Sequence, residues 1–162
     1  LLPDDGFRIS CTSADKQGRF TQFFHVEVTP KTWEGEWADA RTFCFFEEIE
    51  FLIRNGMIKG GSLENAVVID EFCILNPEGL RFPDEFARHK VLDAIGDLTL
   101  IGHPVIGAFT ARKSGHTLNQ ALVRRLLADP TARRVVRVSA DAQLEPVEIR
   151  LPALGVPETR TA

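Results

Sequence analysis

Apolar and polar residues alternate over two segments near the N-terminus, residues 7–12 and residues 24–28. Alternation of this kind is typical of a β-strand that buries one face. The polar residues 15–18 lie between the two segments and favour a turn. The pattern therefore predicts a β-hairpin at the start of the chain.

The segment that follows has the signals of a helix start. Thr29 is a good N-cap, and Pro30 suits the first helical position. Trp33, Trp37 and Ala40 follow at a spacing that predicts one buried stripe. We therefore expect a helix that begins at Pro30.

Helical periodicity predicts three longer helices, at residues 45–53, 83–98 and 115–127. The first is amphipathic and ends at Asn55-Gly56. In the last, three leucines are expected to face the core: Leu118, Leu122 and Leu126. Shorter apolar runs at residues 66–69, 104–110 and 135–138 predict further strands. Because strands and helices mix without a regular βαβ repeat, the pattern indicates the α+β class.

The composition is that of an ordinary globular domain. The 162 residues are 44% hydrophobic and 26% charged, and a net charge of −4 argues against nucleic-acid binding. No stretch approaches about 18 apolar residues and no signal peptide is visible, so we expect a cytoplasmic protein without a transmembrane segment. Cys11, Cys44 and Cys73 are scattered among apolar residues and are expected to be reduced, buried thiols.

The candidate chemistry concentrates on the predicted helix at residues 83–98. His89, Asp93 and Asp97 are spaced by four, so they form one row along the helix. An imidazole and a carboxylate one turn apart can bind one metal ion, and such a nitrogen and oxygen pair suits zinc. The alternative is a solvated helix face that carries a histidine–aspartate pair.

A second polar group of residues lies at the start of the last predicted helix. Lys113, Ser114, Gly115 and His116 stand where a strand leads into a helix N-terminus, and such a terminus favours anions. Ser114 suits a helix N-cap better than a nucleophile, because no catalytic triad pattern surrounds it.

Five motifs follow one another along the chain: Arg41-Thr42-Phe43, Gly60-Gly61-Ser62, Leu80-Arg81-Phe82, the pattern His-Lys-x-x-Asp-x-x-Gly-Asp-Leu at residues 89–98, and Lys-Ser-Gly-His-Thr-Leu-Asn at residues 113–119. Together they resemble the second, C-terminal domain of the UDP-3-O-acyl-N-acetylglucosamine deacetylase family. The resemblance implies zinc-dependent hydrolysis of the N-acetyl group of UDP-3-O-acyl-N-acetylglucosamine, a step of bacterial lipid A and lipopolysaccharide biosynthesis.

The resemblance also implies a fold. We expect a two-layer sandwich, in which a mixed or antiparallel sheet is backed by a helix pair, with a small β-α-β insert at about residues 43–70. Residues 1–128 would form the second deacetylase domain. Residues 129–162 would form a C-terminal strand and tail, with its tail-like end at residues 152–159.

Residue by residue, the resemblance implies a set of roles. His89 and Asp93 match two of three zinc ligands. His116 matches the histidine that stabilises the tetrahedral intermediate and protonates the leaving amine, and Asp97 matches the carboxylate that orients it. Thr42 matches a hydroxyl that helps to hold the oxyanion, although a helix-terminus hydroxyl is the alternative.

The resemblance further implies substrate contacts. Lys90, Lys113 and Gly115 match groups around the sugar and diphosphate. Phe43 and Ser62 belong to the matching motifs and are expected to touch substrate. The helix at residues 45–53, with Phe46 and Ile49, corresponds to the wall of the acyl-chain passage, although a core-packing helix is the alternative.

The chain departs from the family pattern in two ways. The third zinc histidine and the glutamate base belong to a His-Glu motif of the family's first domain, and no His-Glu dipeptide occurs here; His25 and His103 do not match that motif. Residues 13–19 are polar where the family places an aromatic residue against the uracil, and only Phe20 could substitute.

These observations predict the C-terminal half of a zinc deacetylase that is inactive alone. The chain begins at Leu1 rather than Met, which also suggests a fragment. A missing N-terminal domain would complete the site, and the exposed interdomain face could support self-association. The alternatives are a non-catalytic module that binds a nucleotide-sugar and acyl chain, and a plain structural domain.

Overall fold

The computed structural model describes residues 1–71, 73–138 and 144–146 of the chain. The chain divides into two compact units, Leu1–Gln120 and Ala121–Ala162, and each is described by itself. The first unit contains every candidate site residue predicted from the sequence.

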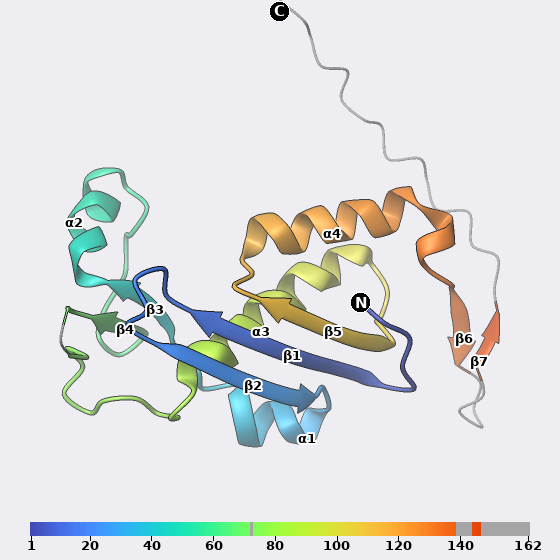
Figure 1. Cartoon of the computed structure of the whole chain (residues 1–162), viewed down its shortest axis with the longest axis horizontal. Helices are drawn as coiled ribbons and strands as arrows, with labels where there is room; N and C mark the ends of the chain where they lie inside the picture. Colours follow the sequence, from blue (N-terminus) through green and yellow to red (C-terminus); the bar gives the residue numbers. More distant parts are fainter. Residues whose placement is uncertain (72, 139–143, 147–162) are drawn as a thin grey trace, which may run out of the picture. The chain divides into compact units, whose positions relative to one another are not determined.

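A mixed three-stranded sheet, in the order β2-β1-β5, forms one layer of the first unit (Figure 1). The central strand β1 (Phe7–Ala14) is antiparallel to β2 (Thr21–Glu27) and parallel to β5 (Gly107–Arg112). Alternate residues of β1 point inward, and Ile9 and Cys11 are completely buried. The predicted hairpin and mixed sheet are confirmed.

The strand β5 starts later than the pattern predicts, at Gly107 rather than Pro104. Proline has no backbone N–H to donate to a neighbouring strand. The N–H of Gly107 donates to the carbonyl of Gly6 at 2.7 Å, and its φ of +156° favours glycine. A Cβ at Gly107 would lie 3.0 Å from the carbonyl oxygen of Leu2, so glycine allows the N-terminal segment to approach.

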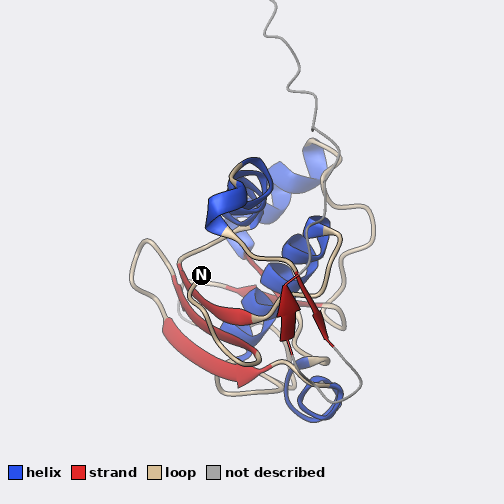
Figure 2. Cartoon of the chain, turned by 90° about the vertical axis from the view of Figure 1, so that its right-hand side faces the viewer, coloured by secondary structure: helices blue, strands red, loops and turns tan. Residues whose placement is uncertain are grey.

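Helix α3 (Glu85–Leu98) runs along one face of this sheet, as both views show (Figure 1; Figure 2). It buries Phe86, Val91, Ala94 and Leu98. Helix α4 (His116–Ala128) follows β5, and its first turn is hydrogen-bonded to the C-terminal part of α3 through Asp97. The α+β class and the layer of helices on a mixed sheet are as predicted.

The predicted β-α-β insert is also present. Strand β3 (Thr42–Phe45) leads into α2 (Phe46–Arg54), and β4 (Ala66–Ile69) returns parallel to β3. Val67 and Ile69 pack with Phe86 of α3 in one apolar cluster, which also includes several half-buried residues: Phe20, Phe43, Phe45, Ile74 and Leu80. This cluster joins the insert to α3.

The helix after β2 differs from the prediction beyond its start. Thr29 and Thr32 form the expected capping box on α1 (Pro30–Thr32). A π-helix (Trp33–Trp37) then replaces the α-helix. Because its turns are wider, the predicted stripe does not form: Trp37 is buried, but Trp33 is 43% exposed.

Two further predictions are wrong in part. Leu118 is 62% exposed rather than in the core, because the neighbouring Asn119 is the buried residue that donates to Asp97. All three cysteines are free thiols, but only Cys11 is buried, while Cys73 is exposed in the turn after β4. Burial raises the pKa of Cys11 to about 11, so this thiol stays protonated at neutral pH.

The second unit contains the rest of α4, a 3-10 turn (Pro130–Ala132) and an antiparallel pair, β6 (Val136–Val138) and β7 (Leu144–Pro146). The strand predicted at residues 135–138 is thus confirmed, whereas the predicted tail at residues 152–159 lies outside the described residues. Within the part of the chain that the structure describes, no helix has the length and apolar character that a membrane crossing requires.

Candidate functional site

The site is built on one face of α3. Glu85, His89, Asp93 and Asp97 succeed one another at intervals of four, so they lie one above another along the helix. The row therefore begins one turn earlier than the sequence analysis placed it. The opposite face carries the apolar residues that pack on the sheet and hold the row in place.

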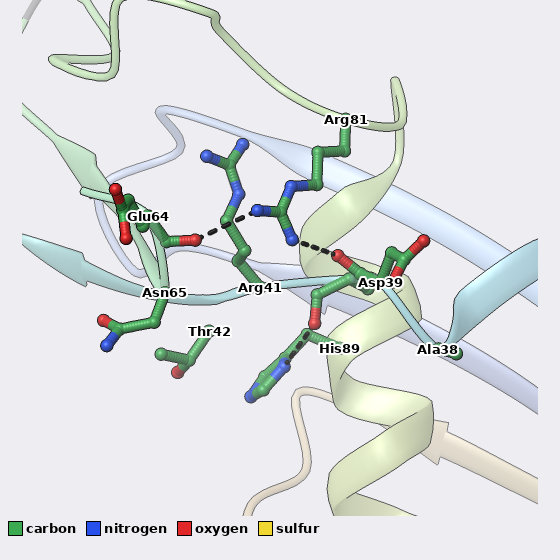
Figure 3. Close-up of a pocket in the computed structure, with 9 residues that line it drawn as sticks. Ala38, Asp39, Arg41, Thr42, Glu64, Asn65, Arg81 and His89 are labelled. Carbon is green, nitrogen blue, oxygen red and sulfur yellow. Dashed lines mark hydrogen bonds between the residues drawn. The ribbon is translucent and has the colours of Figure 1, made fainter. Parts of the chain in front are cut away.

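His89 is oriented by the backbone that precedes β3. Its Nδ1 lies 3.1 Å from the carbonyl oxygen of Ala40. In Figure 3 this contact is the dashed line that ends at the ring of His89. Because a carbonyl oxygen only accepts, Nδ1 carries the proton, and in the neutral ring Nε2 then keeps its lone pair. Nε2 lies 3.4 Å from Oδ1 of Asp93, so the free lone pair and the carboxylate stand side by side.

Asp93 contacts three charged or titratable side chains. Its Oδ2 accepts from Nζ of Lys90 at 2.7 Å. Its Oδ1 lies 3.4 Å from Nε2 of His89 and 3.8 Å from Nε2 of His116. The carboxylate thus joins residues of α3 to the start of α4.

Asp97 anchors the other nitrogen of His116. Oδ2 of Asp97 lies 2.9 Å from Nδ1 of His116 and accepts from Asn119 at 3.0 Å, while Oδ1 accepts from Gln120 at 3.4 Å. Burial alone would raise the pKa of Asp97, but these hydrogen bonds outweigh it and hold the pKa below its ordinary value. Asp97 is therefore an ionised carboxylate at neutral pH, directed at an imidazole whose side chain is 63% exposed.

An open pocket of about 340 Å³ lies beside His89 (Figure 3). Thr42 lines it with His89, and Arg41 and Arg81 line its other side. Thr42 is exposed and is the first residue of β3, so it is not a helix-terminus hydroxyl. The pocket places a hydroxyl near the imidazole of the α3 row.

A second pocket of about 340 Å³ lies next to the loop at residues 15–19. Lys90, Lys113 and Ser114 line it together with Phe43, whose ring centroid is 5.4 Å from Nζ of Lys90. Lys113 has a φ of +49°, which is unusual for a residue with a side chain. The pocket combines two ammonium groups with an aromatic wall.

Ser114 does not form the N-cap that the sequence analysis assigned to it. Helix α4 begins at His116, so Gly115 precedes it, and the carbonyl of Gly115 accepts from the N–H of Asn119. The Oγ of Ser114 is buried and has no hydrogen-bond partner in the described part of the chain. Ser114 lines the second pocket together with Lys90 and Lys113.

The remaining predicted residues lie apart from this group. Ser62 is in the exposed loop before β4, where its N–H donates to the side chain of Asn65. Phe46 is 55% exposed on α2 and Ile49 is half-buried, so α2 does not pack in the core as the alternative required. Phe20 packs edge-on against Phe43 and at a tilt against Phe86, so its ring belongs to the apolar cluster.

Within the described residues, no group of three or more His, Cys, Asp and Glu side chains could hold a metal ion. His89 and Asp93, with Nε2 and Oδ1 3.4 Å apart, are a pair of candidate ligands and fall one short of such a group.

Sequence reasoning missed the residues that support the row. Glu85 is buried at its start, and Asn119 and Gln120 donate to Asp97. A signal for Glu85 was present, because it precedes His89 by four. Asn119 follows His116 by three, which places it on the same helix face.

Several curated proteins are similar to this chain. The model of the LpxC family, UDP-3-O-acyl N-acetylglycosamine deacetylase, matches residues 1–128. A UDP-3-O-acyl-N-acetylglucosamine deacetylase of Anaeromyxobacter dehalogenans (strain 2CP-C) is 56% identical over 163 residues, which cover 100% of this chain and 53% of the relative. The protein of the same name from Anaeromyxobacter sp. (strain Fw109-5) is 60% identical over 160 residues, 98% of this chain and 52% of the relative.

A third relative of that name, from Myxococcus xanthus (strain DK1622), is 51% identical over 140 residues, 84% of this chain and 44% of the relative. The chain thus spans about half the length of the curated relatives it matches.

Proposed function

This chain belongs to the UDP-3-O-acyl-N-acetylglucosamine deacetylase family, and from this premise we propose that it supplies one half of the active site of a zinc-dependent deacetylase. The family resemblance expected from the sequence is confirmed. The observation that carries the proposal is the arrangement of four side chains on α3 and α4. His89 and Asp93 form a candidate ligand pair, Asp97 and His116 form a carboxylate–imidazole pair, and the two pairs are joined because Asp93 also lies near His116.

The chemistry of the α3 row fits zinc. The hydrogen bond from Nδ1 of His89 to the carbonyl of Ala40 leaves Nε2 free to bind a metal, and ligating histidines are usually held in this way. Oδ1 of Asp93 would supply an oxygen ligand beside it. Bound zinc would act as a Lewis acid on the carbonyl of the scissile amide.

His116 and Thr42 would act on the substrate itself. Asp97 orients the imidazole of His116, and as an imidazolium this side chain could stabilise the developing oxyanion and donate a proton to the leaving amine. The hydroxyl of Thr42, in the pocket beside His89, would donate a second hydrogen bond to that oxyanion.

The second pocket would hold the sugar and the diphosphate. Lys90 and Lys113 supply positive charge, the unpartnered hydroxyl of Ser114 supplies a donor, and Gly115 allows the backbone to approach a phosphate. The substrate would be UDP-3-O-acyl-N-acetylglucosamine, with Phe43 and Ser62 as further contacts. Phe46 and Ile49 of α2 would form part of the wall along the acyl chain.

A partner domain would complete the site. The relatives are nearly twice as long as this chain, and His89 and Asp93 are only two of the three ligands that a catalytic zinc needs. We infer that a further domain, which would precede residues 1–128, supplies the third histidine and a glutamate base. The isolated chain, with its tail at 129–162, would then be inactive in lipid A biosynthesis and could self-associate through the uncovered face.

The test is a chimera in which this chain replaces the C-terminal half of the Anaeromyxobacter dehalogenans relative. We expect the zinc-loaded chimera to release acetate from UDP-3-O-acyl-N-acetylglucosamine, and the isolated chain to release none. His89→Ala should abolish acetate release, whereas His103→Ala, an exposed histidine outside the site, should not. A folded, zinc-loaded chimera that binds the nucleotide-sugar without releasing acetate would instead indicate a non-catalytic binding module.

A further inference from the structure

A buried ion pair lies one turn before His89. The side chain of Glu85 is completely buried and that of Arg41 is 2% exposed. Oε1 of Glu85 accepts from the backbone N–H and from Nε of Arg41, both at 2.9 Å. Oε2 accepts from Nη2 of Arg41 at 3.2 Å and from the backbone N–H of Arg81 at 2.6 Å. The carboxylate is thereby saturated with donors.

This pair fixes the segment at residues 39–42 against α3. The backbone N–H of Arg41 is held by Glu85 on one side. On the other side the guanidinium of Arg81 donates to the carbonyl of Asp39 and to that of Glu64, each at 3.0 Å, as Figure 3 shows. The segment is therefore held at two points, residue 39 and residue 41.

The held segment contains two groups that the proposed chemistry uses. Between those points lies the carbonyl of Ala40, which accepts from Nδ1 of His89. Immediately after them comes Thr42, in the same pocket as His89. Glu85 and His89 stand on the same face of α3. The helix therefore holds the segment through Glu85, and the segment in turn orients the ring of His89 through the carbonyl of Ala40.

We propose that Glu85, Arg41 and Arg81 are positioning residues of the deacetylase site, which set the tautomer and ring orientation of His89 through the carbonyl of Ala40 and hold Thr42 beside it. This inference rests on the proposed function. None of the three needs to touch the reacting atoms. Removal of one partner should therefore change how His89 binds a metal, and not only how stable the chain is.

The physical case rests on what a buried ion pair supplies. Replacing such a pair by apolar residues is often neutral for stability, so stability alone does not explain its presence. A saturated carboxylate does, however, allow only one arrangement of its donors. Here two of those donors are backbone N–H groups of Arg41 and Arg81, so the arrangement fixes the path of the chain.

The experiment uses the 162-residue chain with labelled histidine. NMR reports the tautomer of His89 and the exchange rate of its Nδ1 proton, and competition with a chelating dye reports affinity for zinc alone. Glu85→Gln keeps the size of the side chain but removes its charge. We expect faster Nδ1 exchange and a loss of zinc affinity of about tenfold, the lower end of what loss of an outer hydrogen-bond partner costs.

Two further variants make the result specific. Arg81→Ala removes an exposed side chain, so the chain should fold, and it should shift the same readouts in the same direction by a smaller factor. Gln22→Ala is the control, because the side chain of Gln22 accepts from the N–H groups of Phe86 and Ala87 at the start of α3 and donates to the carbonyl of Pro83, so these hydrogen bonds do not involve residues 39–42. It should lower stability and leave His89 unchanged.

Unchanged Nδ1 exchange and zinc affinity in Arg81→Ala, and in Glu85→Gln where it folds, would overturn the inference. An equal change in Gln22→Ala would do the same, because the effect would then follow general loss of stability. If the unaltered chain binds no zinc because two ligands alone do not hold it, acetate release by the chimera decides the zinc site and the Nδ1 proton decides the positioning inference.

Discussion

Nδ1 of His116 lies 2.9 Å from Oδ2 of Asp97, although the two residues stand on different helices. Asp97 is buried near the end of α3, and His116 is exposed at the first position of α4. A buried, ionised carboxylate thus fixes one nitrogen of a ring whose remaining surface is open to solvent. This arrangement separates the carboxylate that orients the ring from the imidazole that we propose to react.

His116→Ala in a complete two-domain enzyme should lower kcat by about 10²–10⁴-fold, the usual contribution of a positioned general acid, while KM changes little. Because the side chain is 63% exposed, its loss should barely change the free energy of unfolding. Steady-state kinetics and urea unfolding measure the two effects. Near-normal turnover would return His116 to a structural role.

Asp97→Asn should act in the same direction on kcat, but more mildly, because the imidazole remains. Unlike His116→Ala, it should also destabilise the fold, since Asp97 accepts from Asn119 and Gln120 and an amide cannot satisfy all of these donors. A variant with unchanged kcat would show that Asp97 serves stability only.

The contribution of Glu85 to stability should depend on pH. Burial alone would raise its pKa, but hydrogen bonds from Arg41 and from the N–H groups of Arg41 and Arg81 outweigh it and hold the pKa below its ordinary value. A group whose pKa is lowered by folding stabilises the fold above its unfolded pKa, about 4.3 for glutamate, and loses that contribution as pH falls through the folded value.

Glu85→Gln should therefore cost about 3 kcal/mol at pH 7, as expected when a buried charge loses its partner. The difference from the unaltered chain should shrink as the pH falls from about 4.3 through the lower pKa of the folded state, because only below both values is Glu85 neutral in the folded and the unfolded state. Urea unfolding at several pH values measures it. A difference that stays constant with pH would show that charge is not the cause.

Lys113→Gly should separate stability from binding. A left-handed conformation costs an ordinary residue about 1–2 kcal/mol, and the entropy of glycine offsets about 0.5–1 kcal/mol of that, so the free energy of unfolding should rise by about 0.5–1 kcal/mol. In the complete enzyme KM should rise, because an ammonium group near the diphosphate is lost. Lys31→Ala, at an exposed position that lines neither pocket, is the control for lost charge, and an unchanged KM in Lys113→Gly would remove Lys113 from the binding site.

Phe46→Ser tests the proposed acyl-chain wall. Phe46 is 55% exposed, so the substitution should leave the unfolding free energy within about 0.5 kcal/mol, as surface changes usually do. We expect KM to rise for a long-chain substrate and to stay the same for one with a short acyl chain. An equal effect on both substrates would argue that α2 does not contact the acyl chain.

Much of the fold could be predicted from the sequence, because the elements are locally determined. The hairpin follows from alternation, and the bounds of α3 follow from its apolar face. The predicted stripe of Trp33 and Trp37 is wrong, because residues 33–37 form a π-helix and the hydrophobic periodicity of the sequence does not distinguish a π-helix from an α-helix. The prediction that Leu118 is buried is wrong for a related reason. Asn119 is the buried residue there because it donates a hydrogen bond to Asp97, a contact between two helices that the sequence pattern does not reveal.

In the candidate site, too, some features could be predicted from the sequence and others could not. The spacing of His89, Asp93 and Asp97 predicts that they lie on one helix face, and in the structure all three belong to α3. Their roles came from a family resemblance and remain proposals. The support from Ala40 and Arg41 could not be predicted, because it depends on backbone groups that lie 44 to 49 residues away along the chain.

The pairing of β1 with β5 has a consequence for how the chain folds. The central strand, β1, meets its parallel neighbour about a hundred residues later, with Phe7 opposite Gly107. The antiparallel β1–β2 contact closes early, but the sheet cannot be completed until residues 107–112 have left the ribosome. Until then one edge of β1 is open to other strands, and pairing over so long a loop is slow, so this edge is where misfolding of a nascent chain would begin.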